Sequence, residues 1–213
     1  MAEKSTQQDK IIDDANLFRA FRLMKAKDYT QAEALINEGI TKAHQENNVE
    51  LEGLYYSALG VLYKLKKNYN KAYGAYQKAE RLLPDDHSLK IVSATLLIEQ
   101  FKQYSTAARK MDKVIASTED PALWHHAKAT QAVAYYLMGK KAEAGANFNE
   151  MLKQDFNLLR FAANVDFKTA ELFVQKKFMP DECRQYLQKA LLLAKSKKEK
   201  TFIVIIENLL KVV

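Results

Sequence analysis

The stretch LEGLYYSALGVLYKLKKNYNKAYGAYQKAERLLP, residues 51–84, decides the fold of this 213-residue chain. Its first half places four residues at i, i+3, i+4 and i+7, which is one face of a helix: Tyr56, Leu59, Gly60 and Tyr63. Its second half alternates small and large residues on a second helix, which a proline ends: Ala72, Tyr76, Ala79 and Pro84. Because Gly60 has no side chain, we expect it to let the second helix approach the first closely.

This pattern resembles the tetratricopeptide repeat, a pair of antiparallel helices of about 34 residues. The resemblance covers the aromatic, Leu-Gly, Tyr, Ala, second aromatic and Pro positions of the repeat, with Tyr56 in place of the usual tryptophan. It implies an all-α fold, in which helix pairs stack into a right-handed superhelical α-solenoid.

The small residue of the second helix recurs along the chain and gives the number of repeats. It stands at intervals of 40, 35, 37 and 39 residues: Ala32, Ala72, Ala107, Ala144 and Cys183. We therefore predict a flexible N-terminal segment over residues 1–12 and five helix pairs, at 13–46, 53–86, 88–121, 125–158 and 164–197. Residues 198–213 are predicted to form a C-terminal capping helix, because a solenoid needs an end unit that covers its last exposed face.

A shorter motif marks the turn inside three of these pairs. KDYTQAEALI from Lys27, KNYNKAYGAY from Lys67 and KQYSTAARKM from Lys102 share a lysine, a tyrosine and an alanine at the same spacing. We expect the tyrosine to pack at the helix turn and the alanine to admit the neighbouring helix. The lysine is the residue of this motif that we expect to carry function.

Composition limits the class of protein. Glycine and proline are scarce, at 6 and 3 residues, and 48% of the residues are hydrophobic, so the chain is neither disordered nor collagen-like. Cys183 is the only cysteine, which excludes an internal disulfide and fits a reducing compartment. The N-terminus lacks the apolar core of a secretion signal, and no apolar run has the length of a membrane span. These features predict a cytoplasmic protein without membrane insertion.

The resemblance also implies a concave groove, which the first helix of each pair lines. The residues at the groove positions of the repeat are mostly apolar: Leu17, Phe21, Met24, Leu54, Ser57, Val61, Lys64, Leu89, Val92, Leu96, Glu99, Ala129, Val133 and Tyr136. Such a groove suits a hydrophobic or amphipathic segment of a partner protein. The alternative is that these side chains pack against neighbouring helices, or that the N-terminal segment fills the groove.

Lysines gather where the first helix of each pair turns into the second: Lys25, Lys27, Lys66, Lys67, Lys102, Lys140, Lys141, Lys176 and Lys177. Since the net charge is +7, we predict a basic rim that favours an acidic partner surface. The alternative is that these lysines only stabilise helix C-termini, by about 0.3 to 1 kcal/mol each. No arginine-rich base-reading motif is present, so specific nucleic-acid binding is not expected.

The chain offers no pattern that indicates catalysis. His125 and His126 are adjacent and point about 100° apart on a helix, which is poor geometry for a shared metal ion, so we expect ordinary helix residues. Cys183 occupies the small-residue position of the fifth repeat, where a packing role is expected. Glycine-rich phosphate loops and the HExxH and GxSxG motifs are absent. We predict no enzyme activity, no metal and no cofactor.

The sequence therefore predicts a non-enzymatic adaptor or scaffold that binds a segment of another protein. The alternative is a chaperone-like holder of an exported or aggregation-prone client protein. The run from Phe202 to Ile206 in the predicted capping helix is unusually apolar, which offers a surface for self-association with a second copy of the chain.

Overall fold

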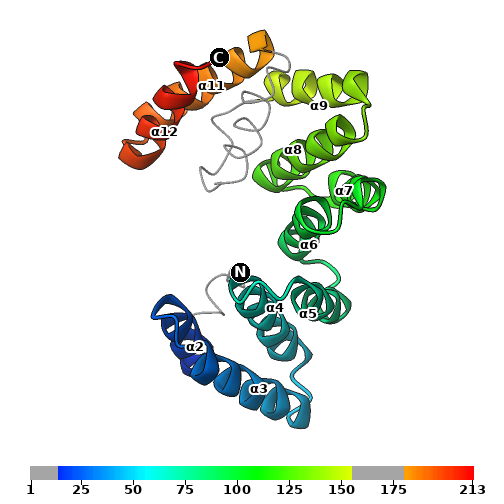
Figure 1. Ribbon diagram of the computed structural model, residues 1–213, viewed down its shortest axis with the longest axis vertical. Coiled ribbons are helices and arrows are strands. Elements are labelled where there is room, and N and C mark those ends of the chain that lie inside the picture. The colour runs from blue at the N-terminus through cyan, green and yellow to red at the C-terminus, as the bar shows by residue number, and fades with distance from the viewer. Residues whose placement is uncertain (1–13, 155–179) are drawn as a thin grey trace, which may run out of the picture. The chain divides into compact units, whose positions relative to one another are not determined.

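The computed structural model describes residues 14–154 and 180–213, which form ten α-helices and no strand (Figure 1). In chain order the helices are α2 (Ala15–Lys25), α3 (Tyr29–Gln45), α4 (Val49–Leu65), α5 (Tyr69–Leu82), α6 (His87–Glu99), α7 (Tyr104–Ser117), α8 (Pro121–Leu137), α9 (Lys141–Lys153), α11 (Pro180–Ser196) and α12 (Lys200–Leu210). The chain divides into two compact units, Met1–Leu89 and Lys90–Val213. The predicted all-α fold of sequential helix pairs is confirmed.

The first unit packs consecutive helices through small residues. α2 contacts α3, α3 contacts α4, α4 contacts α5, and α2 also contacts α4. A Cβ atom added to Gly60 of α4 would lie 2.5 Å from Cε1 of Tyr76 on α5, so the two helices approach as closely as the sequence predicted. A Cβ atom added to Gly39 of α3 would lie 2.1 Å from Cζ of Tyr55 on α4, so these two helices also approach closely.

The second unit contains a core that extends through its last four described helices. α7 contacts α8, α8 contacts α9, α9 contacts α11, and α11 contacts α12. The core residues are Ala129, Ala132, Phe148, Met151, Cys183, Tyr186, Leu187, Ala190, Leu193, Ala194 and Ile206. Cys183 is fully buried there, at the small-residue position predicted for it. The first helix of the predicted fifth pair lies outside the described residues.

The Lys-x-Tyr-x-x-Ala motif forms the turn between two helices of a pair. Its lysine adopts the left-handed conformation after the first helix, with φ of 57° at Lys67, where the amide of Lys67 donates to the carbonyl of Lys64 at 3.0 Å. The amide of Asn68 donates to the carbonyl of Tyr63 at 2.8 Å, which completes a Schellman motif. Lys27 and Lys102 also have positive φ. The lysine of the motif is therefore a structural residue as well as a charged one.

The residue after this lysine is the N-cap of the next helix. The side chains of Asp28 and Asn68 accept hydrogen bonds from the amides of Gln31 and Lys71, so each residue ends one helix and caps the next. The tyrosine of the motif is then the first helical residue, and the alanine of all three copies is fully buried. Helix pairs connect in this way with few glycines, since only Gly139 supplies a glycine with positive φ in the described part of the chain.

The described helices are not of the kind that crosses a lipid bilayer. None of those in residues 14–154 and 180–213 combines the length and the apolar composition that a membrane span requires.

Candidate functional site

The predicted groove residues divide into buried and accessible side chains. Six of the fourteen have at most 9% of their surface exposed: Leu17, Met24, Leu54, Leu89, Leu96 and Ala129. A helix inside a stack exposes only a narrow stripe, so positions at the edge of that stripe turn toward neighbouring helices. These six side chains pack inside the chain and are not available to a partner, which corrects the prediction that they line an open groove.

The other eight predicted residues keep accessible surface. Phe21 and Glu99 are exposed, and six are half-buried: Ser57, Val61, Lys64, Val92, Val133 and Tyr136. Phe21, on α2, is the most accessible apolar side chain of the predicted set. The one fully exposed apolar side chain of the predicted groove therefore lies in the first unit.

The exposed side of α2 combines aromatic rings with cations. Phe18 and Phe21 are 56% and 39% exposed, and Arg22 and Lys25 are exposed beside them. Their spacing of i, i+3, i+4 and i+7 places the four residues on one stripe of the helix. The sequence prediction missed Phe18 because it used the groove positions of the repeat. Those positions select Leu17 and not Phe18 in this turn of the helix. The spacing of the four residues would have identified Phe18.

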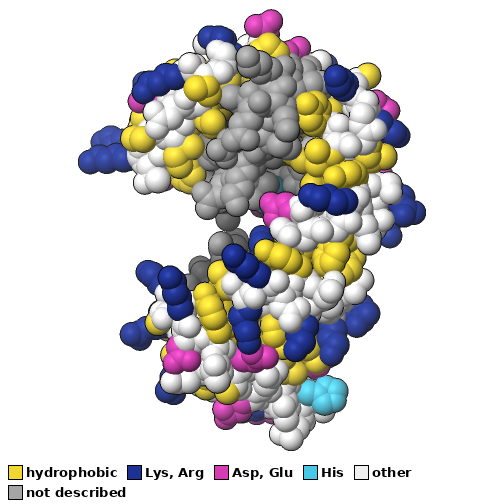
Figure 2. Space-filling model, viewed as in Figure 1, with side chains coloured by type: hydrophobic (Ala, Val, Ile, Leu, Met, Phe, Trp, Pro, Cys, Tyr) yellow, Lys and Arg dark blue, Asp and Glu magenta, His cyan; other side chains and the backbone are white. Residues whose placement is uncertain are grey.

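Equivalent positions on α4 continue this surface. The first two repeats are offset by 40 residues, so Phe21 corresponds to Val61 and Lys25 corresponds to Leu65. The two helices are in contact, Val61 is half-buried, and Leu65 is exposed. Figure 2 shows hydrophobic side chains next to Lys and Arg side chains over these helices. We name as the α2–α4 face the residues Phe18, Phe21, Arg22, Lys25, Val61 and Leu65.

Asp14 fixes the start of α2 and connects it to α4. Its Oδ1 atom accepts hydrogen bonds from the amide of Leu17 at 2.8 Å and from the hydroxyl of Tyr55 at 2.7 Å. Burial and the Asp14 carboxylate both raise the pKa of Tyr55, so the hydroxyl stays a neutral donor at neutral pH. The α2–α4 face is therefore built on two helices that a partly buried hydrogen bond connects.

The region around α2 is positively charged. Between Asp14 and Asp28 the chain has no carboxylate, and its four cations are all exposed: Arg19, Arg22, Lys25 and Lys27. Cations on one exposed helix attract anionic groups and repel other cations. The aromatic side chains of α2 therefore lie in a basic setting.

The seven described lysines of the predicted basic rim are exposed, and Lys176 and Lys177 lie outside the described residues. Three of the seven interact with the chain itself. Lys66 pairs with Glu33 at 2.7 Å, Lys102 donates to the carbonyl of Glu99 at 3.0 Å, and Lys140 lies 3.9 Å from Glu143. The other four make no ion pair within the described part of the chain: Lys25, Lys27, Lys67 and Lys141.

Glu33 links the first helix pair to the second. Its two carboxylate oxygens accept hydrogen bonds from the hydroxyl of Tyr63 at 2.8 Å and from Nζ of Lys66 at 2.7 Å. Lys71 lies over the Tyr63 ring, 5.4 Å from its centroid. The hydrogen bond from Lys66 lowers the pKa of Glu33 below its usual value. Lys66 therefore acts mainly as a structural residue.

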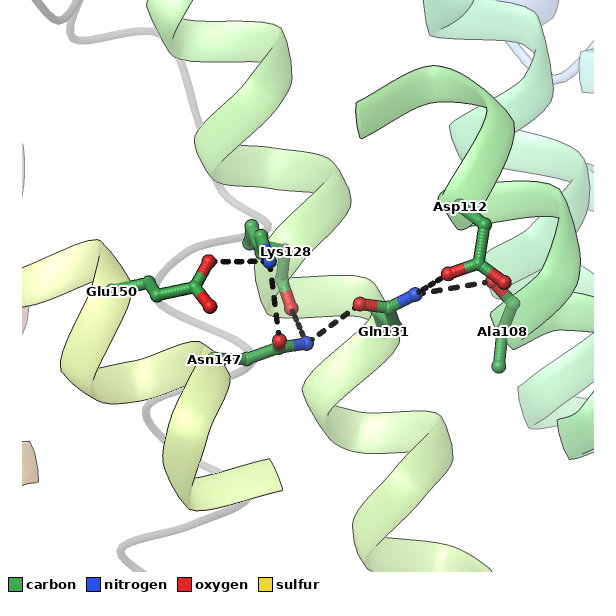
Figure 3. Close-up of polar contacts among 6 residues, drawn as sticks. All are labelled: Ala108, Asp112, Lys128, Gln131, Asn147 and Glu150. Carbon is green, nitrogen blue, oxygen red and sulfur yellow. Dashed lines mark hydrogen bonds and ion pairs between the residues drawn. The ribbon is translucent and has the colours of Figure 1, made fainter. Parts of the chain in front are cut away.

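A ladder of polar side chains crosses three helices of the second unit (Figure 3). Gln131 of α8 donates to Asp112 of α7 at 2.6 Å, and Asn147 of α9 donates to the side-chain oxygen of Gln131 at 2.9 Å. Lys128 pairs with Glu150 at 2.6 Å. Since Gln131 and Asn147 are buried, these contacts fix how α7, α8 and α9 align. The sequence prediction missed this ladder, although two amides at otherwise small or apolar positions could have indicated it.

The residues considered for chemistry lie in the core. His125 is fully buried and its ring stacks on Tyr186 with centroids 5.4 Å apart, which agrees with a packing role. Burial raises the pKa of the Cys183 thiol to about 12, so it is not a reactive thiolate at neutral pH. Across residues 14–154 and 180–213 no group of three or more His, Cys, Asp or Glu residues is arranged to hold a metal ion.

Comparison with known proteins identifies structures with a similar fold. No protein-family model matches the chain, and no curated protein sequence matches it. The crystal structure of PilW, a widely conserved type IV pilus biogenesis factor, is 17% identical with a TM-score of 0.59, and the match covers 92% of this chain and 90% of that one. The Pseudomonas aeruginosa pilF structure is 18% identical with a TM-score of 0.59, over 97% of this chain and 93% of that one.

Such identities establish similarity of fold alone. The repeated turn motif, the close approach of Gly39 and Gly60 to tyrosines of the next helix and the sequential contacts of the helices agree with these structural matches. The chain therefore has a fold of stacked helix pairs similar to that of these two structures.

Proposed function

We propose that the chain is a non-enzymatic adaptor that binds an acidic amphipathic segment of another protein on its α2–α4 face. The observation that carries this proposal is the exposure of Phe18 and Phe21 between cations on one stripe of α2. Soluble proteins seldom leave two neighbouring aromatic rings in water without a binding role, and aromatic residues together with arginine are enriched at interfaces.

The chemistry of the face defines the kind of segment that fits. Each phenylalanine contributes about 1.5 to 3 kcal/mol when it is fully buried, so apolar side chains of the partner should cover Phe18 and Phe21. Arg22 and Lys25 favour carboxylates at the edge of that contact and increase the association rate at low salt. Micromolar affinity, about −8 kcal/mol, is within reach after the costs of ordering the segment.

A second proposal concerns the assembly in which the adaptor acts. The match to PilW extends over nearly the whole length of both chains, and PilW is described as a type IV pilus biogenesis factor. A role in building a surface pilus is therefore proposed for this chain as well. Deleting its gene and counting surface pili by electron microscopy tests this role, and an unchanged number of pili would contradict it.

The chaperone-like alternative predicts a different response to loss of the protein. An adaptor leaves its folded partner soluble when it is removed, whereas a chaperone's client aggregates. Solubility of the bound partner after depletion of this chain therefore separates the two functions.

The adaptor proposal is tested with a defined probe. The probe is a fluorescent helical peptide of about 15 residues, with leucines at i, i+3, i+4 and i+7 and glutamates elsewhere. We expect Phe21→Ser to weaken its binding about tenfold in an anisotropy titration, because a buried ring is lost. Leu137→Ser is the matched control, because Leu137 is 37% exposed and lies in the second unit, whereas Phe21 is 39% exposed.

The charge of the face is tested with the same peptide. Reversing Arg22 and Lys25 to glutamate should weaken binding at the α2–α4 face and reduce the salt dependence of binding there, whereas Lys113→Glu on α7 should leave both unchanged. Equal losses in the α2 variant and in the Lys113 control would show that only the net charge of the chain matters. That result would reject the α2–α4 face as the binding site.

A further inference from the structure

Exposed aliphatic side chains gather at the end of the described chain. Of nine large hydrophobic side chains exposed in residues 14–154 and 180–213, four lie in or directly after α11 and α12: Leu192, Val204, Ile205 and Val212. Exposed apolar side chains that gather in this way indicate an interaction site.

The two faces of α12 have different environments. The inner face packs on α11 through the fully buried Ile206, with half-buried side chains around it: Phe202, Ile203, Leu209 and Leu210. The outer face presents Val204 and Asn208 at i and i+4, with Ile205 beside them and Val212 in the turn that follows the helix. Residues at this spacing form the ridge that packs into the groove of another helix. We refer to these four residues as the outer α12 face.

Polar contacts hold α12 on α11 and so keep this face in place. The Arg184 guanidinium on α11 donates to the carbonyl of Val213 beyond the end of α12. Lys195 on α11 pairs with Glu207 on α12 at 3.1 Å. A face that is already ordered loses less conformational entropy when it binds.

The charge around the outer α12 face is positive. Lys198, Lys200 and Lys211 are exposed near the two ends of α12, and Glu199 is the exposed carboxylate next to two of them. The excess is wider than this helix. Residues 1–89 contain 13 basic and 13 acidic residues, so the entire net charge of +7 belongs to residues 90–213. An acidic partner is favoured at this end of the chain.

Size and charge both disfavour a second copy of the chain as the occupant. An eleven-residue helix is about 16 Å long, and one face of it buries on the order of 200 Å², against about 800 Å² per partner in a stable dimer. Two copies would also bring lysines of the same sign together. A short helix that carries carboxylates fits both the ridge and the charge.

We propose that the outer α12 face is a second docking surface, which binds an acidic amphipathic helix independently of the α2–α4 face. The chain then joins two acidic segments, or two parts of one partner, and the second contact forms at a raised effective concentration. An adaptor with one such face in each unit is a bridge between proteins.

The test counts binding sites for the glutamate and leucine peptide by isothermal titration calorimetry. The intact chain should bind two peptides, and a variant with Val204→Ser and Val212→Ser should lose one site, with affinity there reduced roughly tenfold or more. Val49→Ser is the matched control, because Val49 is 52% exposed against 58% for Val204 and lies at the start of α4. It should leave both sites intact.

The α2 variant separates this proposal from the proposed function. Phe18→Ser with Phe21→Ser should remove only the other site. If the outer α12 variant still binds two peptides, the second docking surface is refuted while the proposed function stands. If the α2 variant retains both sites, the proposed function fails instead.

Two further results would overturn the choice of occupant. A chain that sediments as a dimer, and as a monomer after Val204→Ser, would identify a second copy as the occupant. Binding to phosphatidylglycerol vesicles that is lost in the same variant would identify an anionic lipid surface. Lys200→Glu with Lys211→Glu should reduce peptide binding roughly fivefold at low salt, and unchanged binding would contradict the proposed charge complementarity.

Discussion

Gly60→Ala tests the contact that sets the distance between the two helices of a pair. The new Cβ atom would lie 2.5, 2.6 and 2.8 Å from Cε1, Cδ1 and Cζ of Tyr76, whereas carbon atoms pack best at about 3.5 to 4.0 Å. The ring has to move by about 1 Å, and it is only 1% exposed, so it cannot turn into solvent. Overpacking of this kind costs about 1 to 3 kcal/mol.

The gain in helix propensity offsets part of this cost. Replacing glycine by alanine inside a helix stabilises by about 1 kcal/mol, which leaves a net loss of about 2 kcal/mol if the overpacking is at the upper end of its range. Gly74→Ala on α5 is the matched control, because its Cβ would meet nothing within 4 Å. It should raise the free energy of unfolding by about 0.5 to 1 kcal/mol.

Urea denaturation followed by circular dichroism measures both changes. Gly60→Ala should also lose most of its effect in a Tyr76→Leu background, because leucine lacks the ring atoms Cε1 and Cζ. If Gly60→Ala stabilises the chain as much as Gly74→Ala does, the reasoning about close approach is refuted.

Three other predictions concern single features of the structure. Lys67→Gly should stabilise the chain by about 0.5 to 1 kcal/mol, because Lys67 has positive φ. Gly139→Ala should destabilise it by about 1 kcal/mol, because Gly139 also has positive φ. Thermal melts measure both changes. Asn147→Leu should lower the free energy of unfolding by about 1 to 3 kcal/mol, measured in urea, because buried partners of the amide are left unsatisfied. Lys66 lowers the pKa of Glu33 in the folded chain. The stability that this carboxylate adds is therefore present above the usual glutamate pKa of 4.5 and is lost as the pH falls below it. Glu33→Gln should flatten the dependence of the free energy of unfolding on pH in that range.

The sequence was sufficient for the fold because the repeat is encoded locally. Gly60 and Tyr76 identify a helix pair by their spacing and type, and the structure places them in contact as predicted. Accessibility was harder to predict, since it depends on neighbours that a single repeat does not contain. Leu96 and Phe21 were assigned to one groove, yet Leu96 is buried and Phe21 is exposed. The amide ladder through Asn147 was missed because its members lie on three different helices.

The lysines of the turn show the same limit. Lys67 was expected to carry function. The structure also gives it a structural role, since its left-handed backbone conformation closes the turn between two helices. Charge can be read from a sequence, but the backbone conformation of a turn depends on the helices that it joins. Lys25 keeps the functional interpretation, because it lies on the α2–α4 face and makes no ion pair within the described residues.

Hydrogen exchange with and without the acidic peptide shows whether the α2–α4 face is the binding site. We expect slower exchange in α2 and in the second half of α4, around Phe21 and Val61, when the peptide binds. A chain with Phe21→Ser should show little of this protection at the same peptide concentration. If the peptide is bound but α2 and α4 gain no protection, the α2–α4 face is not its binding site.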